Sequence, residues 1–375
     1  MKILSLSNCA LVESQGSGYV ALNFIRGLRA LGHEVEAFGP EDFEPLTGWR
    51  LGRNFRLALG MAWCAFWKLL TKKYDVVEFY GGHAWFAVRY LARRRHRRFL
   101  LVQHTNGPEP RYEKMLDRHF GSDRRRWFQL SQATLMKRAF TCPDLVVTVS
   151  ESDRSWLIDE GYQPPKQVIA IENPIADVFF EPHDPLRKEK IIGYCGTWLP
   201  KKGIHILAPD ISRILQAFPE YRLLLIGVGN AFKPEEYFPE IAAARIEVIP
   251  HIENKVDLRR QYERMELFVF PSVIESFGLA LAEAMACGCA VVATQVGFAA
   301  SLRNRIDAML LEKAESPQLY DAVKELIARP DLRQYLAANG HRRVAHLKWG
   351  PAVRKLSDVY EASRHGVEAA SRHAN

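Results

Sequence analysis

Short apolar runs alternate with longer helical segments along almost the whole chain, and this alternation constrains the fold more than any other feature. Each run is four to six residues long and rich in Val, Ile, Leu and Phe. Such alternation is typical of doubly wound α/β domains with parallel sheets. The predicted strands are Lys2–Ser7, Glu34–Phe38, Val76–Phe79, Phe99–His104, Leu145–Val149, Ile191–Tyr194, Arg222–Ile226, Ile246–Ile249, Leu267–Phe270 and Ala290–Thr294.

The length of the chain and the position of its prolines indicate two domains. A chain of 375 residues can form two hydrophobic cores. The stretch 173–190 contains Pro174, Pro182 and Pro185 and has little periodicity, so it is predicted to be a linker. We predict an N-terminal domain over residues 1–175, a linker over 176–190, a second domain over 191–348 and a C-terminal segment over 349–375.

Nothing in the sequence indicates secretion or a membrane span. The run Lys2–Ser7 is predicted to be a strand rather than a signal peptide. The longest uncharged apolar stretch, Leu57–Trp67, has eleven residues, which is too short for a helix that crosses a bilayer. The six cysteines show no Cys-x-x-Cys spacing, so we expect thiols in a reducing cytosol and no zinc site.

The positive charge of the chain is concentrated in one region. The net charge is +8, yet residues 50–138 hold 20 Lys and Arg against 6 Asp and Glu. Residues 50–73 are predicted to form a helix with basic ends around Trp63, Phe66 and Trp67, which suits an anionic membrane surface. The alternative is a core helix packed on the sheet. Nucleic acid is not expected, because no recognised binding module accompanies the charge.

Two glutamates bracket the start of a predicted helix after the strand Leu267–Phe270. Glu275 and Glu283 are separated by seven residues. On one ideal helix they would lie about 12 Å apart along the axis and about 80° apart around it. They could therefore contact opposite ends of an extended ligand, but not one atom. An amphipathic helix with one capping and one solvated glutamate is the alternative interpretation.

The loop between the glutamates is suited to an anion. We expect Glu275 in the loop and Ser276 near the helix N-cap. The backbone amides of Phe277, Gly278 and Leu279 would then point at a phosphate, assisted by the helix dipole.

In its context, this segment resembles the Glu-x7-Glu motif of family-four retaining glycosyltransferases, which have the GT-B fold. Gly196–Gly203 is similar to the phosphate loop of that family, and Leu223–Gly229 to its strand ending in Gly-x-Gly. Leu145–Glu151 is similar to its last N-domain strand. The resemblance extends from Met1 to about Trp349 and implies two Rossmann-like doubly wound domains that face a central cleft. It implies that the N-terminal domain, 1–175, binds the acceptor and that the second domain, 191–348, binds the nucleotide sugar. It also implies a C-terminal helix, within 349–375, that crosses back to the first domain.

The resemblance implies roles for residues of the second domain. Glu283 would hold the ribose hydroxyls of a nucleotide-diphosphate sugar, and Glu275 would position the transferred sugar. Lys202 and the backbone amides of 277–279 would bind the diphosphate, so no metal is required, and no Asp-x-Asp motif occurs. Gly196 and Thr197 belong to the same phosphate loop. Thr197 stands where the family has an arginine, a departure that puts the donor affinity in doubt.

Two further candidates lie in the first domain. His104 ends an apolar strand and matches the active-site histidine of the family, although a histidine that hydrogen-bonds its loop is an equal alternative. Gly16–Ala21 fits Gly-x-Gly-x-x-Ala, but Asn8–Gln15 separates it from the strand, which argues against a dinucleotide site. The family has a glycine-rich loop here, so Gly18 is expected near the donor phosphates or the acceptor.

We therefore expect a retaining, metal-independent, hexosyltransferase-like enzyme that moves a sugar from a nucleotide sugar to an acceptor hydroxyl in glycan, polysaccharide or glycolipid synthesis. A lipid-linked or glycan acceptor suits the basic, aromatic region 50–138, with the protein cytoplasmic and peripheral on the inner membrane face. The alternatives are a nucleotide-sugar epimerase on the same architecture, a non-catalytic nucleotide-binding protein and a polyanion-binding scaffold.

Overall fold

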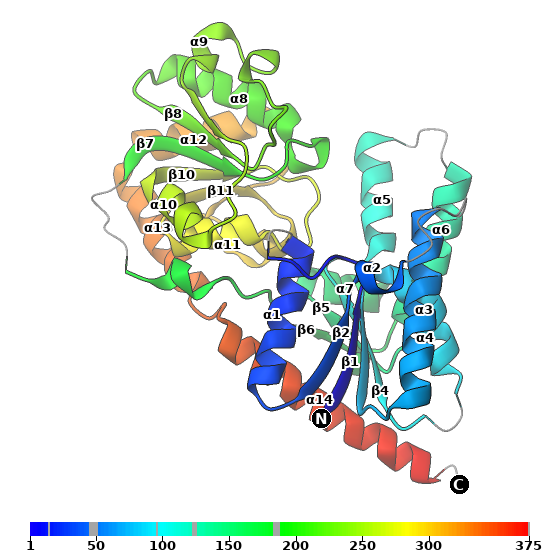
Figure 1. Ribbon diagram of the computed structural model, residues 1–375. Helices are drawn as coiled ribbons and strands as arrows, with labels where there is room; N and C mark the ends of the chain where they lie inside the picture. Colours follow the sequence, from blue (N-terminus) through cyan, green and yellow to red (C-terminus); the bar gives the residue numbers. More distant parts are fainter. Residues whose placement is uncertain (14–15, 45–51, 95–96, 122–125, 183–187, 374–375) are drawn as a thin grey trace. The chain divides into compact units, whose positions relative to one another are not determined.

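The computed structural model describes the chain except for residues 14–15, 45–51, 95–96, 122–125, 183–187 and 374–375. Two compact units are formed by Met1–Pro174 with Trp349–Asn375, and by Ile175–Lys348. Each unit contains one six-stranded sheet in which every pair of neighbouring strands is parallel (Figure 1). The predicted fold class, with two doubly wound α/β domains, is confirmed. Within the predicted basic region, Arg50, Arg95, His96, Arg124 and Arg125 lie outside the described residues.

The first unit has the strand order β2-β1-β3-β4-β5-β6. Its strands are β1 (Lys2–Ser7), β2 (Glu34–Phe38), β3 (Val76–Tyr80), β4 (Leu100–Thr105), β5 (Leu145–Thr148) and β6 (Val168–Ala170). Its helices are α1 (Gly16–Ala30), α2 (Pro40–Phe43), α3 (Arg53–Thr71), α4 (Trp85–Ala92), α5 (Glu109–Phe120), α6 (Arg126–Thr141), α7 (Glu151–Asp159) and α14 (Trp349–His373).

Alternating side chains divide this sheet into two faces. Leu4, Leu6 and Phe79 pack against α3 and α4, where Leu57 and Met61 complete the core. Helices α1 and α14 lie on the other side of the sheet (Figure 1). The period-2 geometry of a strand explains how one strand serves both faces. Helix α14 is held to α1 by Trp349, whose ring packs edge-on against Tyr19 and Phe24.

The second unit has the strand order β12-β11-β10-β7-β8-β9. Its strands are β7 (Glu189–Cys195), β8 (Arg222–Ile226), β9 (Ile246–Ile249), β10 (Met265–Phe270), β11 (Ala290–Thr294) and β12 (Met309–Leu311). Its helices are α8 (Ile204–Ala217), α9 (Glu240–Ala243), α10 (Lys255–Arg264), α11 (Leu279–Ala286), α12 (Gln318–Ala328) and α13 (Pro330–Val344). Its core includes Leu223, Leu225 and Leu267 from the strands and Ile211 and Leu215 from α8.

All ten predicted strands are present, and their ends differ from the prediction by at most two residues. The three-residue strands β6 and β12 were not predicted, since so short a run shows no periodicity. The helix predicted over 50–73 is observed as α3, from Arg53 to Thr71.

Candidate active site

Two loops of the second unit meet where the strand order of its sheet reverses. Strand β7 lies between β10 and β8, and later strands extend the sheet from both sides of it. Ligands of doubly wound proteins bind at such a switch point, beyond the carboxyl ends of the strands. The backbone amide of Val273, after β10, donates a hydrogen bond of 2.9 Å to the carbonyl of Lys201, after β7.

Glycine at position 203 permits the close approach of the two loops. Gly203 has a φ of +77°, and a Cβ atom there would lie 1.9 Å from the carbonyl oxygen of Pro271. A side chain would therefore force the loops apart and strain the backbone. The phosphate-loop glycine predicted from the sequence thus has a demonstrable packing role.

This contact places Lys202 beside Glu275. Lys202 ends the short 3-10 turn Pro200–Lys202, and its ammonium donates a hydrogen bond to Oε2 of the Glu275 carboxylate. Both side chains are partly buried. The structure thus brings together two residues that the sequence analysis selected 73 positions apart. A ligand phosphate would compete with Glu275 for the ammonium group.

Helix α11 begins later than predicted. Gly278, with a φ of +95°, is its N-cap and Leu279 its first residue, whereas Ser276 is buried before the cap. The prediction of an N-cap near Ser276 was wrong, because the chain enters the helix through a left-handed conformation that glycine adopts and serine avoids. Leu279 and Ala280 are first-turn residues, whose amides have no intrahelical acceptor. The amide of Phe277 precedes the helix.

Glu283 lies on α11 and is only 4% exposed. Its Oε1 accepts a hydrogen bond of 2.9 Å from the Lys255 ammonium, and its Oε2 one of 3.2 Å from the Tyr262 hydroxyl. Burial raises the pKa of the nearby Cys195 thiol to about 11, and Glu283 and Lys202 both act on this thiol electrostatically. Residues at both ends of the predicted donor site thus act on Cys195, the last residue of β7.

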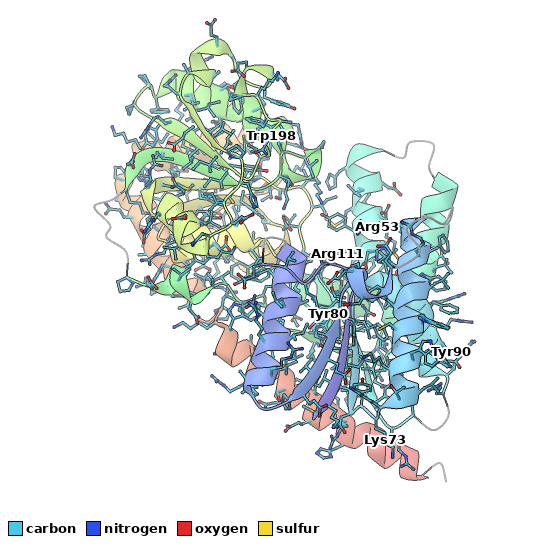
Figure 2. The ribbon with its side chains drawn as sticks, viewed as in Figure 1. Arg53, Lys73, Tyr80, Tyr90, Arg111 and Trp198 are labelled. Carbon is cyan, nitrogen blue, oxygen red and sulfur yellow. The ribbon has the colours of Figure 1, made fainter. Side chains whose placement is uncertain are left out.

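The rest of the predicted phosphate loop is anchored by an aromatic cluster. Gly196 has a φ of +153°, and the carbonyl of Thr197 accepts a hydrogen bond of 3.0 Å from the Tyr194 hydroxyl. Trp198, labelled in Figure 2, packs against Phe232 and Tyr237 with ring centroids 4.8 and 5.2 Å away. Trp198 was not among the predicted site residues, although a tryptophan inside a glycine-bounded loop was the available signal.

His104 lies inside β4 and takes part in a buried polar network of the first unit. Its Nε2 is 2.6 Å from the hydroxyl of Tyr360, on α14, and 3.3 Å from Oε2 of Glu78. Its ring stacks on that of Tyr80, labelled in Figure 2, with centroids 4.3 Å apart. The hydroxyl of Tyr360 also donates a hydrogen bond to Glu78. The partners of His104 therefore come from β3 and α14, and its role in catalysis stays a prediction.

The glycine-rich segment Gly16–Ala21 is not a loop. It forms the first turns of α1, and a Cβ at Gly18 would lie 2.0 Å from the carbonyl oxygen of Ala10. The expectation of a loop was wrong because the pattern also suits a helix that packs closely on a preceding backbone segment. A contact between Gly18 and phosphate stays a prediction.

A polar cluster that the sequence analysis missed follows β1, β3 and β4. Nδ2 of Asn8 is 2.9 Å from Nδ1 of His83, and Nε2 of His83 is 3.2 Å from Oδ1 of Asn54. Glu109 accepts a hydrogen bond of 2.7 Å from the amide of Gly82. Burial lowers the pKa of His83 and raises that of Glu109, so burial favours the neutral form of each. Polar residues directly after strands were the signal for this cluster.

No helix in the described ranges combines the length and apolar composition needed to cross a membrane. Among the same residues, no three His, Cys, Asp or Glu side chains are grouped so that they could hold a metal ion.

Two family profiles match the two halves of the chain. Residues 14–177 match the family described as Glycosyltransferase Family 4, and residues 189–329 match Glycosyl transferases group 1. The chain therefore belongs to the group 1, family-four glycosyltransferases, as the resemblance in the sequence indicated, and its fold is GT-B.

Individual relatives are more distant. A D-inositol 3-phosphate glycosyltransferase of Corynebacterium urealyticum is 27% identical over 55% of this chain and 54% of its own length. A phosphatidyl-myo-inositol mannosyltransferase of Mycobacterium leprae is 29% identical over 43% of each chain. The chain thus spans about half of these relatives or less. The structure of sucrose-phosphate synthase from Thermosynechococcus elongatus is similar over 96% of this chain and 99% of its own, with a TM-score of 0.78 and 18% identity.

Proposed function

We propose that the protein transfers a sugar from a nucleotide-diphosphate sugar to an acceptor hydroxyl, with retention of the anomeric configuration. The observation that supports this most is the ion pair between Lys202 and Glu275 at the strand-order switch point, directly before α11. Glu283, on the same helix, supplies a second carboxylate close to the end of β7. A cation, helix amides and two carboxylates suit a ligand with a diphosphate and two sets of hydroxyls.

In this proposal the protein acts mainly through electrostatics. Negative charge develops on the leaving diphosphate, and Lys202 with the first amides of α11 stabilises it without a metal ion. Arrival of the phosphate draws Lys202 away from Glu275, whose carboxylate then accepts hydrogen bonds from the transferred sugar. Glu283 accepts hydrogen bonds from the ribose. The acceptor hydroxyl attacks the anomeric carbon on the face from which the diphosphate leaves. The new glycosidic bond forms as the bond between the anomeric carbon and the phosphate oxygen breaks, and the departing phosphate takes the proton of the hydroxyl.

We propose a lipid-linked or glycan acceptor and assign its recognition to the cluster of Asn8, His83 and Glu109. These groups lie at the carboxyl ends of β1, β3 and β4, where ligands bind in such sheets. The cluster offers donors and acceptors of little net charge, which suits hydroxyls. The name of one relative, phosphatidyl-myo-inositol mannosyltransferase, supports a lipid acceptor.

The test is a transfer assay with labelled UDP-, GDP-, ADP- and dTDP-sugars and a membrane lipid extract, in EDTA. The proposal predicts one labelled glycolipid whose anomeric configuration matches that of the donor. An epimerised donor formed without acceptor would indicate an epimerase. Donor binding without any product would favour the non-catalytic alternative that Thr197 suggests. An inverted product or a strict metal requirement would contradict the mechanism.

A further inference from the structure

Two neighbouring helices of the first unit enclose an apolar groove that is open to solvent. The groove lies along α3 and α4 and has a volume of about 560 Å³. Ala62, Trp63 and Phe66 line it from α3, and Phe86 and Tyr90 line it from α4. An apolar groove of this size suits an aliphatic ligand.

Large apolar side chains continue the groove onto the surface. Leu59, Trp63, Trp67 and Leu70 form an exposed stripe along α3, at positions one helical turn apart. Trp63 is 63% exposed, and Tyr90, which points outward from α4 in Figure 2, is 50% exposed. Contiguous exposed apolar surface of this kind marks an interaction site.

The two helices that line the groove carry charges of one sign. Residues 50–74 and 85–98, which contain both helices, include twelve Lys and Arg but no Asp or Glu. At the groove, the guanidinium of Arg94 lies over the rings of Phe66 and Tyr90, 5.8 and 5.6 Å from their centroids. A cation at the edge of an apolar groove matches the arrangement of a phosphate above a hydrocarbon chain.

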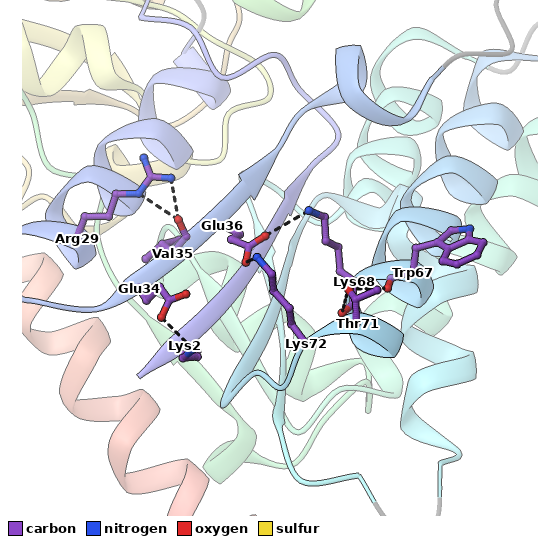
Figure 3. Close-up of polar contacts among 9 residues, drawn as sticks. All are labelled: Lys2, Arg29, Glu34, Val35, Glu36, Trp67, Lys68, Thr71 and Lys72. Atoms are coloured by element: carbon purple, nitrogen blue, oxygen red, sulfur yellow. Dashed lines mark hydrogen bonds and ion pairs between the residues drawn. The ribbon is translucent and has the colours of Figure 1, made fainter.

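The ends of α3 remain positive despite their ion pairs. Glu36 pairs with both Lys68 and Lys72, at 3.2 and 2.6 Å (Figure 3). The two arginines in the first turn of α3 likewise share Glu44. Because each carboxylate faces two cations, each of these two groups of ion pairs carries a net positive charge.

We propose that this groove holds one hydrocarbon chain of an anionic membrane lipid, while Arg94 and the ends of α3 face the phosphates of the bilayer surface. The inference rests on the proposed function, since it places the protein where a lipid-linked acceptor is found. Charge complementarity favours an anionic lipid over a second copy of this chain. In a symmetric dimer, the same cations would face each other.

The test compares the recovery of the full chain with floated vesicles of phosphatidylcholine alone and of phosphatidylcholine with phosphatidylglycerol. Wild type should be recovered about tenfold more with the anionic vesicles, and high salt should reduce this excess. Trp67→Ser removes an exposed anchor that does not line the groove, and Ala62→Trp fills the groove. Both should lose most of the recovery. Tyr335→Ser, which removes a large exposed side chain from the second unit, is the matched control and should behave as wild type.

A second measurement tests the groove itself. Native mass spectrometry with monomeric lysophosphatidylglycerol should show one lipid retained by wild type and by Trp67→Ser, because Trp67 does not line the groove, and none by Ala62→Trp. Equal retention by all three proteins would overturn the groove assignment. Equal recovery with neutral and anionic vesicles, or a wild-type dimer that Trp67→Ser dissociates, would overturn the choice of lipid as occupant.

Donor binding separates this inference from the proposed function. If both variants bind a nucleoside diphosphate as wild type does but no protein binds lipid, only the groove assignment fails. If wild type binds lipid but no nucleoside diphosphate, the proposed function fails and the groove assignment stands.

Discussion

At the scale of single residues, the site depends on charged groups whose partners come from distant parts of the chain. Lys202 contacts Glu275 and Lys255 contacts Glu283, so two carboxylates of one segment receive cations from two others. Carboxylates and ammonium groups in a partly buried site stabilise each other. A ligand that carries both phosphates and hydroxyls can replace them, because its phosphates pair with the ammonium groups and its hydroxyls donate hydrogen bonds to the carboxylates.

Glu283→Gln tests whether Glu283 accepts hydrogen bonds from the ribose hydroxyls. The amide keeps the size of the side chain but weakens acceptance of hydroxyl hydrogen bonds. We expect wild type to bind a nucleoside diphosphate at least about tenfold more tightly than its 2′-deoxy analogue, and the variant to lose most of this preference. Isothermal titration calorimetry measures both affinities. Glu247→Gln, which removes an ion pair to Arg264 at the edge strand β9, is the control. An unchanged preference in Glu283→Gln would refute the assignment.

Glu109→Gln tests whether the polar cluster of Asn8, His83 and Glu109 is buried, through the pH dependence of stability. Burial raises the folded-state pKa of Glu109 above 4.5, so its protonated form is favoured in the fold. The resulting stability is fully present below pH 4.5 and is lost as the pH rises through the folded-state pKa. Glutamine avoids this loss and still accepts the hydrogen bond from Gly82. We expect a higher unfolding midpoint than wild type at pH 8 and little difference at pH 4.

Thermal unfolding at both pH values measures this effect, at about 2–4 °C for each kcal/mol. The exposed Glu235→Gln should show no such dependence. A variant less stable than wild type at pH 8 would mean that the ionised carboxylate stabilises the fold.

At the scale of elements, the sequence predicted what depends on local pattern. The ten longer strands and α3 follow from periodicity. The cap of α11 at Gly278 was missed because it depends on backbone conformation rather than on a favourable capping side chain. The partners of His104 and the contact of Asn8 with His83 were missed because packing joins residues remote in the sequence.

Gly203→Ala tests the contact between the two loops of the site. The change adds strain at a φ of +77° and a clash with Pro271, so we expect a loss of about 2–4 kcal/mol in the free energy of unfolding. Gly229→Ala is the matched control, because Gly229 has a φ of +91° but a Cβ atom there would meet nothing within 4 Å. Denaturant unfolding measures both. Equal losses would show that strain alone matters and that the loops are not held by this contact.

At the scale of the whole molecule, the chain completes its first unit only at its C-terminal end. After the second unit, which ends at Lys348, α14 returns to the first unit and contributes Tyr360 to its buried network. The first unit therefore needs residues separated by the whole second unit, and its stability is not encoded in a continuous segment.

Tyr360→Phe tests this dependence. It removes the hydroxyl that contacts His104 and donates a hydrogen bond to Glu78, so the fully buried carboxylate of Glu78 loses that donor. We expect a loss of about 1–3 kcal/mol in the free energy of unfolding. Hydrogen exchange should become faster in β3 and β4 and stay unchanged in β7 and β10. Tyr335→Phe, at an exposed position, should change neither region. Equal exchange rates in β3 and β4 of wild type, Tyr360→Phe and Tyr335→Phe would contradict a stabilising role for α14.

The central claim is that Lys202 and its surroundings form a metal-independent site for the diphosphate of a nucleotide sugar. Its most direct test is calorimetric titration of UDP, GDP, ADP and dTDP, in EDTA, into wild type, Lys202→Ala and Lys190→Ala. Lys190 lies on the same strand-and-loop segment, near the start of β7 and away from the site. We predict that one nucleotide binds wild type and Lys190→Ala equally and binds Lys202→Ala at least about tenfold more weakly. Equal affinity for all three proteins, or no binding by wild type, would contradict the account.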